Sequence, residues 1–154
     1  MAPYKFYMQK VDASGNLIAN TKKDLETDFN GLKYSQCVGL LTKGKRKDIY
    51  TESYADSDTL RVWQGENVTR EATTITFTFV FTGESRQSVF QSFYDYVKNG
   101  VISYYDTARM KEACLILVDN VEPSDDIFVG STPYIKADFK FQNIWGECKD
   151  KTSN

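Results

Sequence analysis

Histidine is absent from this 154-residue chain, and its absence limits the chemistry that the protein can perform. Histidine is the commonest metal ligand and the usual general base near neutral pH. Without it, the chain cannot form a serine triad, a Cys–His dyad or a histidine-rich zinc site. The glycine-rich loops that cradle phosphates, GxxxxGK[ST] and GxGxxG, are missing as well. We therefore expect a protein that is not an enzyme, with no catalytic residue, no cofactor and no metal.

Cysteine is scarce, and its pattern argues against a disulfide framework. Cys37, Cys114 and Cys148 are widely spaced, odd in number and form no CxxC pair. Cys37 and Cys114 fall inside expected strands, where a free cysteine usually acts as a small buried hydrophobe. Cys148 lies in a polar segment and is expected to be exposed.

Long apolar runs and a strong net charge are also missing. No run approaches the roughly 20 apolar residues of a membrane-spanning helix, and the N-terminus lacks the apolar core of a secretory signal. The chain has 19 Lys and Arg against 21 Asp and Glu, a net charge of −2, so its overall field attracts neither nucleic acid nor acidic membranes strongly. We expect a protein that is made and folded in a cytosol.

The acidic residues gather in two turn-like segments, ADSD at 55–58 and EPSDD at 122–126. Short polar side chains in such segments commonly hydrogen-bond the local backbone. The spacing does not fit a calcium-binding EF-hand loop. Hydrolysis by a carboxylate pair stays formally open, but solvated turns are the favoured interpretation.

Aromatic residues are plentiful, with ten Tyr and ten Phe, and they favour a sheet. Residues 73–82 alternate strictly, with Ile75, Phe77, Phe79 and Phe81 on one face and mostly threonine on the other. Residues 134–144 alternate in the same way, with Ile135, Ala137, Phe139 and Phe141 inward. Further strands are expected at 4–11, 32–41, 49–54, 60–63, 101–105 and 112–118.

A single convincing helix is expected at about residues 85–98. Apolar residues recur there at helical spacing, and Gly100 sits where a left-handed residue ends many helices. Together the elements predict a mainly β protein, an antiparallel β-sandwich or barrel flanked by one α-helix. We expect one domain at 1–146 and a polar C-terminal tail at 147–154, of which the last residues, KDKTSN at 149–154, are expected to be frayed.

The order of these elements resembles the building block of tailed-phage tails that is shared by the tail-tube protein and the N-terminal domain of the distal-tail protein. The matching features are the strand TTITFTFVFTG, the helix SRQSVFQSFYDYVKNG, the strand and turn VISYYDTAR, and the late strand YIKADFKFQNIWG. The segment YTESYADSDTLRVWQGENVTREATTITFTF also resembles proteins from tail-gene clusters of phages and prophages of Bacteroides-like bacteria. The resemblance spans about residues 32–146. Distal-tail proteins usually carry a second, C-terminal domain, for which we expect no room here.

The resemblance implies a virion structural protein that assembles into a ring or tube, in a tail tube, a distal tail or a baseplate hub. The implied partners are other tail proteins and further copies of the chain, with a hexamer as one ring order that the resemblance allows. It implies synthesis in the bacterial host cytoplasm and a final place in the virion tail. No membrane and no sequence-specific nucleic acid are expected, with DNA at most passing through a lumen.

A ring closes when two different patches of one subunit meet around a symmetry axis. The candidate interface residues are a basic turn, two acidic turns and an Arg–Trp pair: Lys43, Lys45, Arg46, Lys47, Asp56, Asp58, Asp125, Asp126, Arg61 and Trp63. The basic turn of one copy could meet an acidic turn of the next, and Trp and Arg are enriched at energetic hot spots. The alternatives are a solvated hairpin tip for the basic turn and a core position for Trp63.

Two other functions stay open. The chain could be a tail terminator or adaptor of the same machine. It could also be a carbohydrate-binding β-sandwich, in which Trp63 and Trp145 stack on sugar rings.

Overall fold

The computed structural model describes residues 4–47, 49–53, 60–64 and 70–151, with the backbone alone described for 49–53 and 60–64. The elements, in chain order, are β1 Phe6–Val11, β2 Lys23–Asp24, α1 Leu25–Asp28, β3 Leu32–Val38, β4 Ile49–Ser53, β5 Leu60–Gln64, β6 Thr73–Thr82, α2 Arg86–Val97, β7 Val101–Asp106, β8 Lys111–Leu117, β9 Ile127–Val129, β10 Thr132–Asn143 and β11 Lys149–Asp150.

Nine of the described strands form one antiparallel sheet, and β4 and β5 form a separate hairpin. The order along the large sheet is β2-β1-β7-β8-β10-β6-β3, with β11 added to β8 and β9 added to β10. Strands β10 and β6 pair along their length, from Tyr134↔Thr82 to Asn143↔Thr73. The mainly β, antiparallel fold predicted from the sequence is therefore confirmed.

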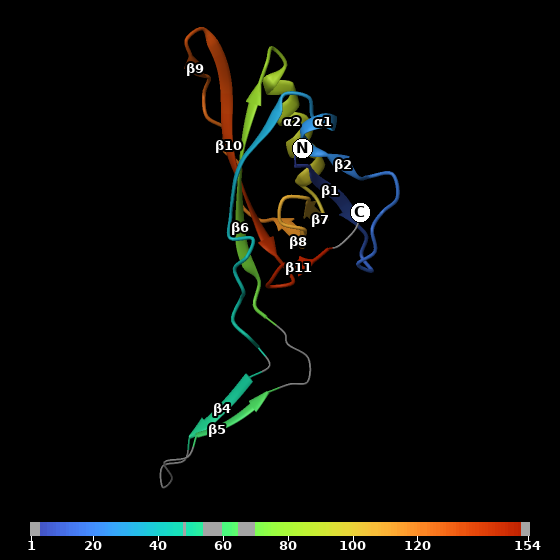
Figure 1. Cartoon of the computed structure of the whole chain (residues 1–154), viewed down its shortest axis with the longest axis vertical. Helices are drawn as coiled ribbons and strands as arrows, with labels where there is room; N and C mark the ends of the chain where they lie inside the picture. The colour runs from blue at the N-terminus through green and yellow to red at the C-terminus, as the bar shows by residue number, and fades with distance from the viewer. Residues whose placement is uncertain (1–3, 48, 54–59, 65–69, 152–154) are drawn as a thin grey trace.

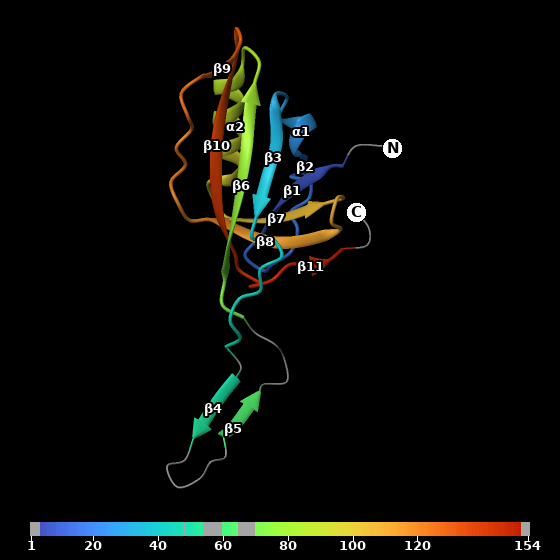
Figure 2. The same ribbon diagram turned by 60° about the vertical axis from the view of Figure 1, so that its left-hand side comes forward.

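The sheet bends sharply where β8 meets β10. Only the last three residues of β10 pair with β8, from Phe141↔Leu117 to Asn143↔Leu115, so the two strands diverge beyond this point. Figure 2 shows the consequence: β10, β6 and β3 run side by side, and β7 and β8 run across them. The two ends of the sheet approach each other again where the Phe6 ring of β1 stacks on the Tyr34 ring of β3, with centroids 3.9 Å apart. The result is a sandwich-like body made from one folded sheet.

Aromatic rings from β6 and β10 fill the space between the two halves. Phe77, Phe79 and Phe81 of β6 are fully buried, as are Phe139 and Phe141 of β10. The inner face of β6 is covered by different elements along its length. Phe79 contacts Phe93 of α2 edge to face at 5.0 Å, whereas Phe77 meets Tyr104 of β7 at 4.9 Å. The predicted alternation of both strands is confirmed by their burial patterns. The predicted helix is confirmed as well, because both ends of α2 lie within one residue of the expected bounds.

The threonine-rich face of β6 points away from this core. Thr74 is exposed, and the other outward residues of the strand are half-buried. The Thr78 hydroxyl donates a hydrogen bond of 2.7 Å to the Asp138 carboxylate on β10. The outer face of β10–β6–β3 is therefore a polar surface.

Four short elements, β2, α1, β9 and β11, were not expected from the sequence. The four-residue helix α1 adds a second helix to the predicted one, and its Leu25 is fully buried. Strand β9 is three residues long, and β11 is two. Because β11 pairs with β8, through Lys149↔Glu112 and Asp150↔Lys111, and the Lys151 amide donates to the Met110 carbonyl at 2.9 Å, residues 149–151 are tied to the body. These three residues do not fray as expected, and 152–154 lie outside the described residues.

The hydroxyl of Tyr96 fastens α2 to the first strands. It donates to the carbonyl oxygens of Met8, at 3.1 Å, and Thr21, at 2.7 Å. Burial raises the pKa of Tyr96 to about 12, with the charge of Asp28 adding to the effect. The protonated hydroxyl is thus favoured in the folded state.

Replacing Tyr96 with Phe is expected to lower the free energy of unfolding by about 1 kcal/mol, the net value of a typical hydrogen bond. Since the folded pKa of Tyr96 lies above its ordinary value of 10.0, this contribution is complete below pH 10 and is lost as pH rises through about 12. Urea unfolding of native and Y96F protein across pH 8–12 measures the difference. Y94F is the matched control, because the Tyr94 hydroxyl donates no hydrogen bond to any residue in the described part of the chain. A native-to-Y96F difference that stays constant across this range would contradict the account.

Candidate functional site

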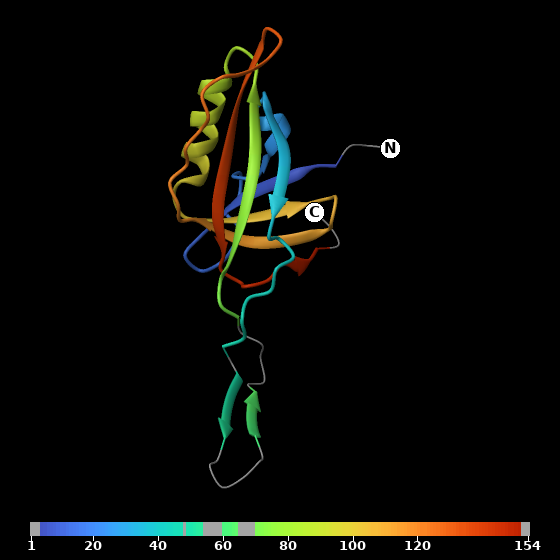
Figure 3. The same cartoon turned by 90° about the vertical axis from the view of Figure 1, so that its left-hand side faces the viewer.

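The most distinctive feature of the molecule is a hairpin that stands apart from the body. Strands β4 and β5 pair in register from Ile49↔Gln64 to Ser53↔Leu60, and they pair with no other described strand. Figures 1 and 3 show this hairpin, which we call the arm, projecting beyond one end of the folded sheet. A projecting hairpin with open strand edges is a common device for contacting another chain.

Three segments that are distant in the sequence hold the base of the arm. We call residues 43–47, 70–71 and 146–147 the arm root. The Gly44 amide donates to the Gly146 carbonyl at 2.7 Å, and the Glu71 amide donates to the Lys45 carbonyl at 2.8 Å. The Arg70 guanidinium donates to the Gly44 carbonyl at 2.9 Å. Its Nε also lies 3.1 Å from the Glu147 carboxylate. The segment that directly follows β10 thus supports the base of the arm.

Two glycines let these backbones come together. A Cβ atom on Gly44 would lie 1.9 Å from the Glu71 carbonyl oxygen. Gly146 has φ +74°, and a Cβ there would lie 2.6 Å from both the Arg70 Cβ and the Glu71 oxygen. No side chain fits at such distances, so the root requires glycine at both positions.

The predicted basic turn is one side of this root. Residues 43–47 run from β3 towards the arm, and Arg46 forms an antiparallel bridge with Arg70. The alternative of a solvated hairpin tip is therefore wrong. Lys43 is exposed and lies 3.7 Å from the Glu147 carboxylate, whereas Lys45 and Lys47 are exposed and Arg46 is half-buried.

The acidic segment 122–126 lies alongside β10, and we call it the strap. The Ser124 amide donates to the Lys136 carbonyl at 2.8 Å, and the Lys136 amide donates to the Ser124 hydroxyl at 3.0 Å. Asp126 accepts two hydrogen bonds from Arg86 at the start of α2, of 2.8 and 2.7 Å. These bonds lower the pKa of Asp126. Asp125 is exposed beside it, so it is the strap carboxylate best placed for a partner.

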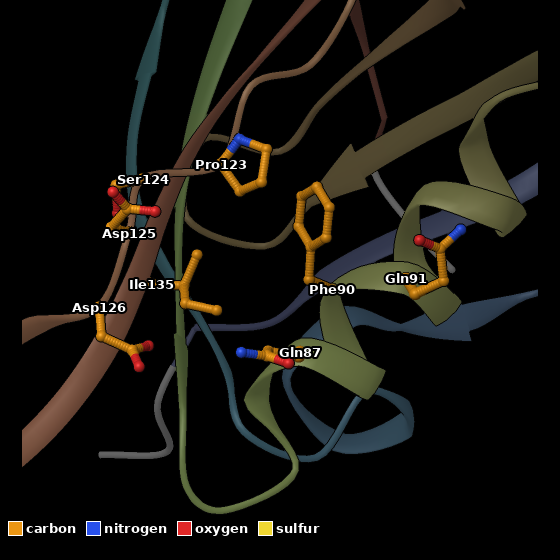
Figure 4. Close-up of a pocket in the computed structure, with 8 residues that line it drawn as sticks. All are labelled: Gln87, Phe90, Gln91, Pro123, Ser124, Asp125, Asp126 and Ile135. Atoms are coloured by element: carbon orange, nitrogen blue, oxygen red, sulfur yellow. The ribbon is translucent and has the colours of Figure 1, made fainter.

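An open pocket of about 610 Å³ separates the strap from α2. Figure 4 shows Gln87, Phe90 and Gln91 of the helix on one side and Asp125 and Asp126 on the other. Ile135 of β10 lies between them. The lining includes the carboxylates of Asp125 and Asp126 and the Ser124 hydroxyl, which accepts a hydrogen bond from the Lys136 amide.

Two of the remaining predicted interface residues, Arg61 and Trp63, lie in β5, opposite Glu52 and Tyr50 of β4, where the backbone alone is described. The other two, Asp56 and Asp58, lie outside the described residues. The predicted residues that the structure describes therefore fall into two places, the arm with its root and the strap.

Sequence reasoning missed a buried polar cluster at the turn between β7 and β8. Asp106 is fully buried. It accepts hydrogen bonds from the Tyr104 hydroxyl at 3.0 Å, the Arg109 amide at 2.7 Å and the Arg109 guanidinium at 3.0 Å. The same guanidinium donates to the Tyr34 hydroxyl of β3 at 3.2 Å. The cluster ties the edge strand β3 to the β7–β8 turn. Its sequence signal was an aspartate directly after the apolar run VISYY, which also fits an ordinary turn.

The chemistry of the cluster is that of a structural support. Burial raises the pKa of the Tyr34, Tyr104 and Cys37 side chains, so they stay protonated at neutral pH. A protonated thiol is a poor nucleophile. No group of three or more Cys, Asp or Glu side chains in the described part of the chain is arranged to hold a metal ion.

The three cysteines are all free. Cys114 is buried as predicted, and Cys37 is half-buried. Cys148 is half-buried against the edge of the core, so the expected exposure is wrong. Trp145 is half-buried and carries the Lys149 ammonium 4.2 Å above its ring, which leaves less of that ring for stacking on a sugar. Among the described residues, no helix is both long and apolar enough to cross a membrane.

Comparisons with known proteins show a similarity at the level of structure. The sequence matches no family model and no curated protein. The fold is similar to that of the Dit protein (gp 19.1) of phage SPP1, with a TM-score of 0.51 and 8% sequence identity. The crystal structure of Dit presents it as a paradigm of the hub adsorption apparatus in phages that infect Gram-positive bacteria. The match covers 90% of this chain and 49% of Dit, so the chain spans about half the length of that protein. At this identity, the similarity concerns the fold.

Proposed function

We propose that this chain is a non-enzymatic structural subunit of a phage tail, which assembles with further copies into a ring or tube at the tail tube, distal tail or baseplate hub. The observation that carries the proposal is the fold similarity to Dit over nine-tenths of the chain. The arm adds support, because hydrogen bonds and close glycine contacts hold its base in place. A hairpin held in this way can present a fixed surface to a neighbouring subunit.

The proposed contact joins the arm root of one copy to the strap of the next. Lys45 and Lys47 are exposed on the root, and Asp125 is exposed on the strap. The two patches have opposite charge and lie on different parts of the subunit, as a ring with heterologous contacts requires.

Negative-stain microscopy of the purified chain at increasing concentration tests the function. We expect closed rings or short tubes with an axial lumen. Particles of single-subunit size at every concentration would contradict the proposal. A monomer that binds specific sugars on a glycan array would favour the carbohydrate-binding alternative instead.

Charge reversal tests the proposed contact. Lys45→Glu or Asp125→Lys alone should weaken assembly, and the two together should restore part of it. Exposed ion pairs are worth about 0.2–1 kcal/mol each, so each single change should raise the concentration at half assembly by about two- to fivefold. Sedimentation velocity at low salt measures this, because screening reduces the effect at high salt. Lys140→Glu is the matched control for an exposed lysine elsewhere on the sheet. Equal effects of K45E and K140E would contradict the pairing.

A further inference from the structure

The turn between β9 and β10 carries an exposed apolar cluster that the proposed contact does not use. The side chains of Ile127, Phe128 and Val129 are 37%, 61% and 69% exposed. They begin a run of nine uncharged residues, IFVGSTPYI at 127–135, in a chain that is 26% charged. We call residues 127–131 the apolar tip. Adjacent exposed apolar side chains on one projection commonly mark a contact site.

Strand β9 is also open on one side. It pairs with β10 through Val129↔Thr132 and Ile127↔Tyr134, and it pairs with no other described strand. The tip lies at the end of the body opposite the arm, as Figures 1 and 2 show. Proteins normally protect such an edge with charge or a covering segment. The tip has neither among the described residues, which is typical of a surface that becomes covered by a partner.

An apolar pocket of about 380 Å³ lies at the other end of β10. Its floor is the outer face of β1, β7 and β8, where Val101, Ser103 and Cys114 are small or apolar. Its rim contains Leu17, which is 50% exposed, and Ile144, which is 45% exposed. Trp145 closes one side.

The charged groups at this pocket are already engaged within the chain. Glu112 lies 3.5 Å from the Lys151 ammonium. The Asp12 carboxylate accepts hydrogen bonds of 2.9 Å from the amides of Ser14 and Asn16. The pocket therefore suits an uncharged apolar insert better than a charged one.

The tip of one molecule cannot occupy the pocket of the same molecule. The tip precedes β10, and Ile144 and Trp145 directly follow its last residue, Asn143. Because β10 has 12 residues and a strand rises about 3.3 Å per residue, the two sites lie about 36 Å apart along a paired strand. Each copy thus carries a donor and an acceptor that only another copy can bring together.

We propose that the apolar tip of one copy inserts into the pocket formed by Leu17, Ile144 and Trp145 on a second copy. This inference rests on the proposed self-assembly and adds a second contact to it. The two sites differ, so the contact is heterologous and propagates from subunit to subunit. Burial by an uncharged tip would leave Glu112 with its lysine partner and Asp12 with its hydrogen bonds from backbone amides.

Directed cross-linking tests the contact. A chain with Val129→Cys is mixed with a mass-tagged chain with Leu17→Cys and oxidised gently, and each chain is also oxidised alone. The expected product is a disulfide between the two different chains, identified by mass spectrometry as joining positions 129 and 17. Absence of this link while rings still form would overturn the inference and leave the proposed function standing. A link between two tips would also overturn it, since it would indicate a two-fold contact. A native chain that never assembles would overturn both.

Loss of the tip's largest side chain tests the energetics. Phe128→Ser should raise the concentration at half assembly by about tenfold to a hundredfold, the effect of no longer burying one Phe side chain. Tyr4→Ser is the matched control, because Tyr4 is an exposed aromatic residue at 57%. Thermal unfolding of both variants should match the native chain, because both positions are exposed. Equal assembly of F128S and native protein would overturn the inference. So would binding of native chain, but not F128S, to vesicles of phosphatidylcholine and phosphatidylglycerol, which would identify the tip as a membrane contact.

Discussion

Replacing Asp106 with alanine is expected to lower the free energy of unfolding by about 2–3 kcal/mol, because it removes the fully buried acceptor of a cluster whose other charged member, Arg109, is half-buried. The carboxylate is fully buried and accepts hydrogen bonds from the Tyr104 hydroxyl and from both the amide and the guanidinium of Arg109. Alanine would leave all three donors without this acceptor. Buried donors that lose their acceptor retain the full cost of desolvation.

Two further variants separate charge from hydrogen bonding at this cluster. Asp106→Asn keeps an oxygen acceptor and loses the charge, so it should fall between alanine and the native residue. Asp119→Ala is the control for an exposed aspartate, and it should change stability by less than about 0.5 kcal/mol. Urea unfolding followed by circular dichroism measures all three. A D106A chain within about 1 kcal/mol of native stability would contradict the role of the cluster in closing the sheet.

Replacing Gly44 with alanine is expected to release the arm and abolish closed rings without unfolding the body. The new Cβ would lie 1.9 Å from the Glu71 carbonyl oxygen, so one of the two backbones must move. Movement breaks the hydrogen bonds that join Gly44 to Gly146 and Lys45 to Glu71. The aromatic core lies elsewhere, around Phe79, Phe93 and Phe139.

Limited proteolysis reports on the root directly. Trypsin cleaves after lysine and arginine, and the root contains Lys45 and Arg46. Cleavage at 45–47 should be at least about tenfold faster in G44A than in the native chain, because a segment that loses its hydrogen bonds opens more often. Gly15→Ala is the control, since a Cβ on Gly15 would meet nothing within 4 Å, so this variant tests an added methyl group without the clash at Gly44. Similar cleavage of G44A and native protein would contradict the root.

The parts of the fold that could be predicted from the sequence are those with a local periodicity. In strands β6 and β10, apolar residues recur at every second position, and in α2 they recur at helical spacing. The buried face of each element can therefore be predicted from its own sequence, without knowledge of what packs against it. The element α1 is four residues long and β11 is two, too short for a pattern. Their placement depends on the core that they meet, such as the fully buried site of Leu25.

The candidate site was less accessible to sequence reasoning because its contacts are long-range. The basic residues at 43–47 were found, but the bridge from Arg46 to Arg70 and the contact of Gly44 with Gly146 join segments that no local pattern connects. Asp126 looked like a free carboxylate because its partner, Arg86, lies 40 residues away. The exposed apolar residues at 127–129 were not predicted, because they directly follow an acidic turn and show no alternation of apolar and polar residues.

The mass of the native chain in solution tests the central claim most directly. Light scattering coupled to size-exclusion chromatography, at increasing protein concentration, should give one species whose mass is a fixed multiple of 17.6 kDa. Such a species indicates closure, because a ring has a defined number of subunits. A mass of one subunit at every concentration would contradict the account.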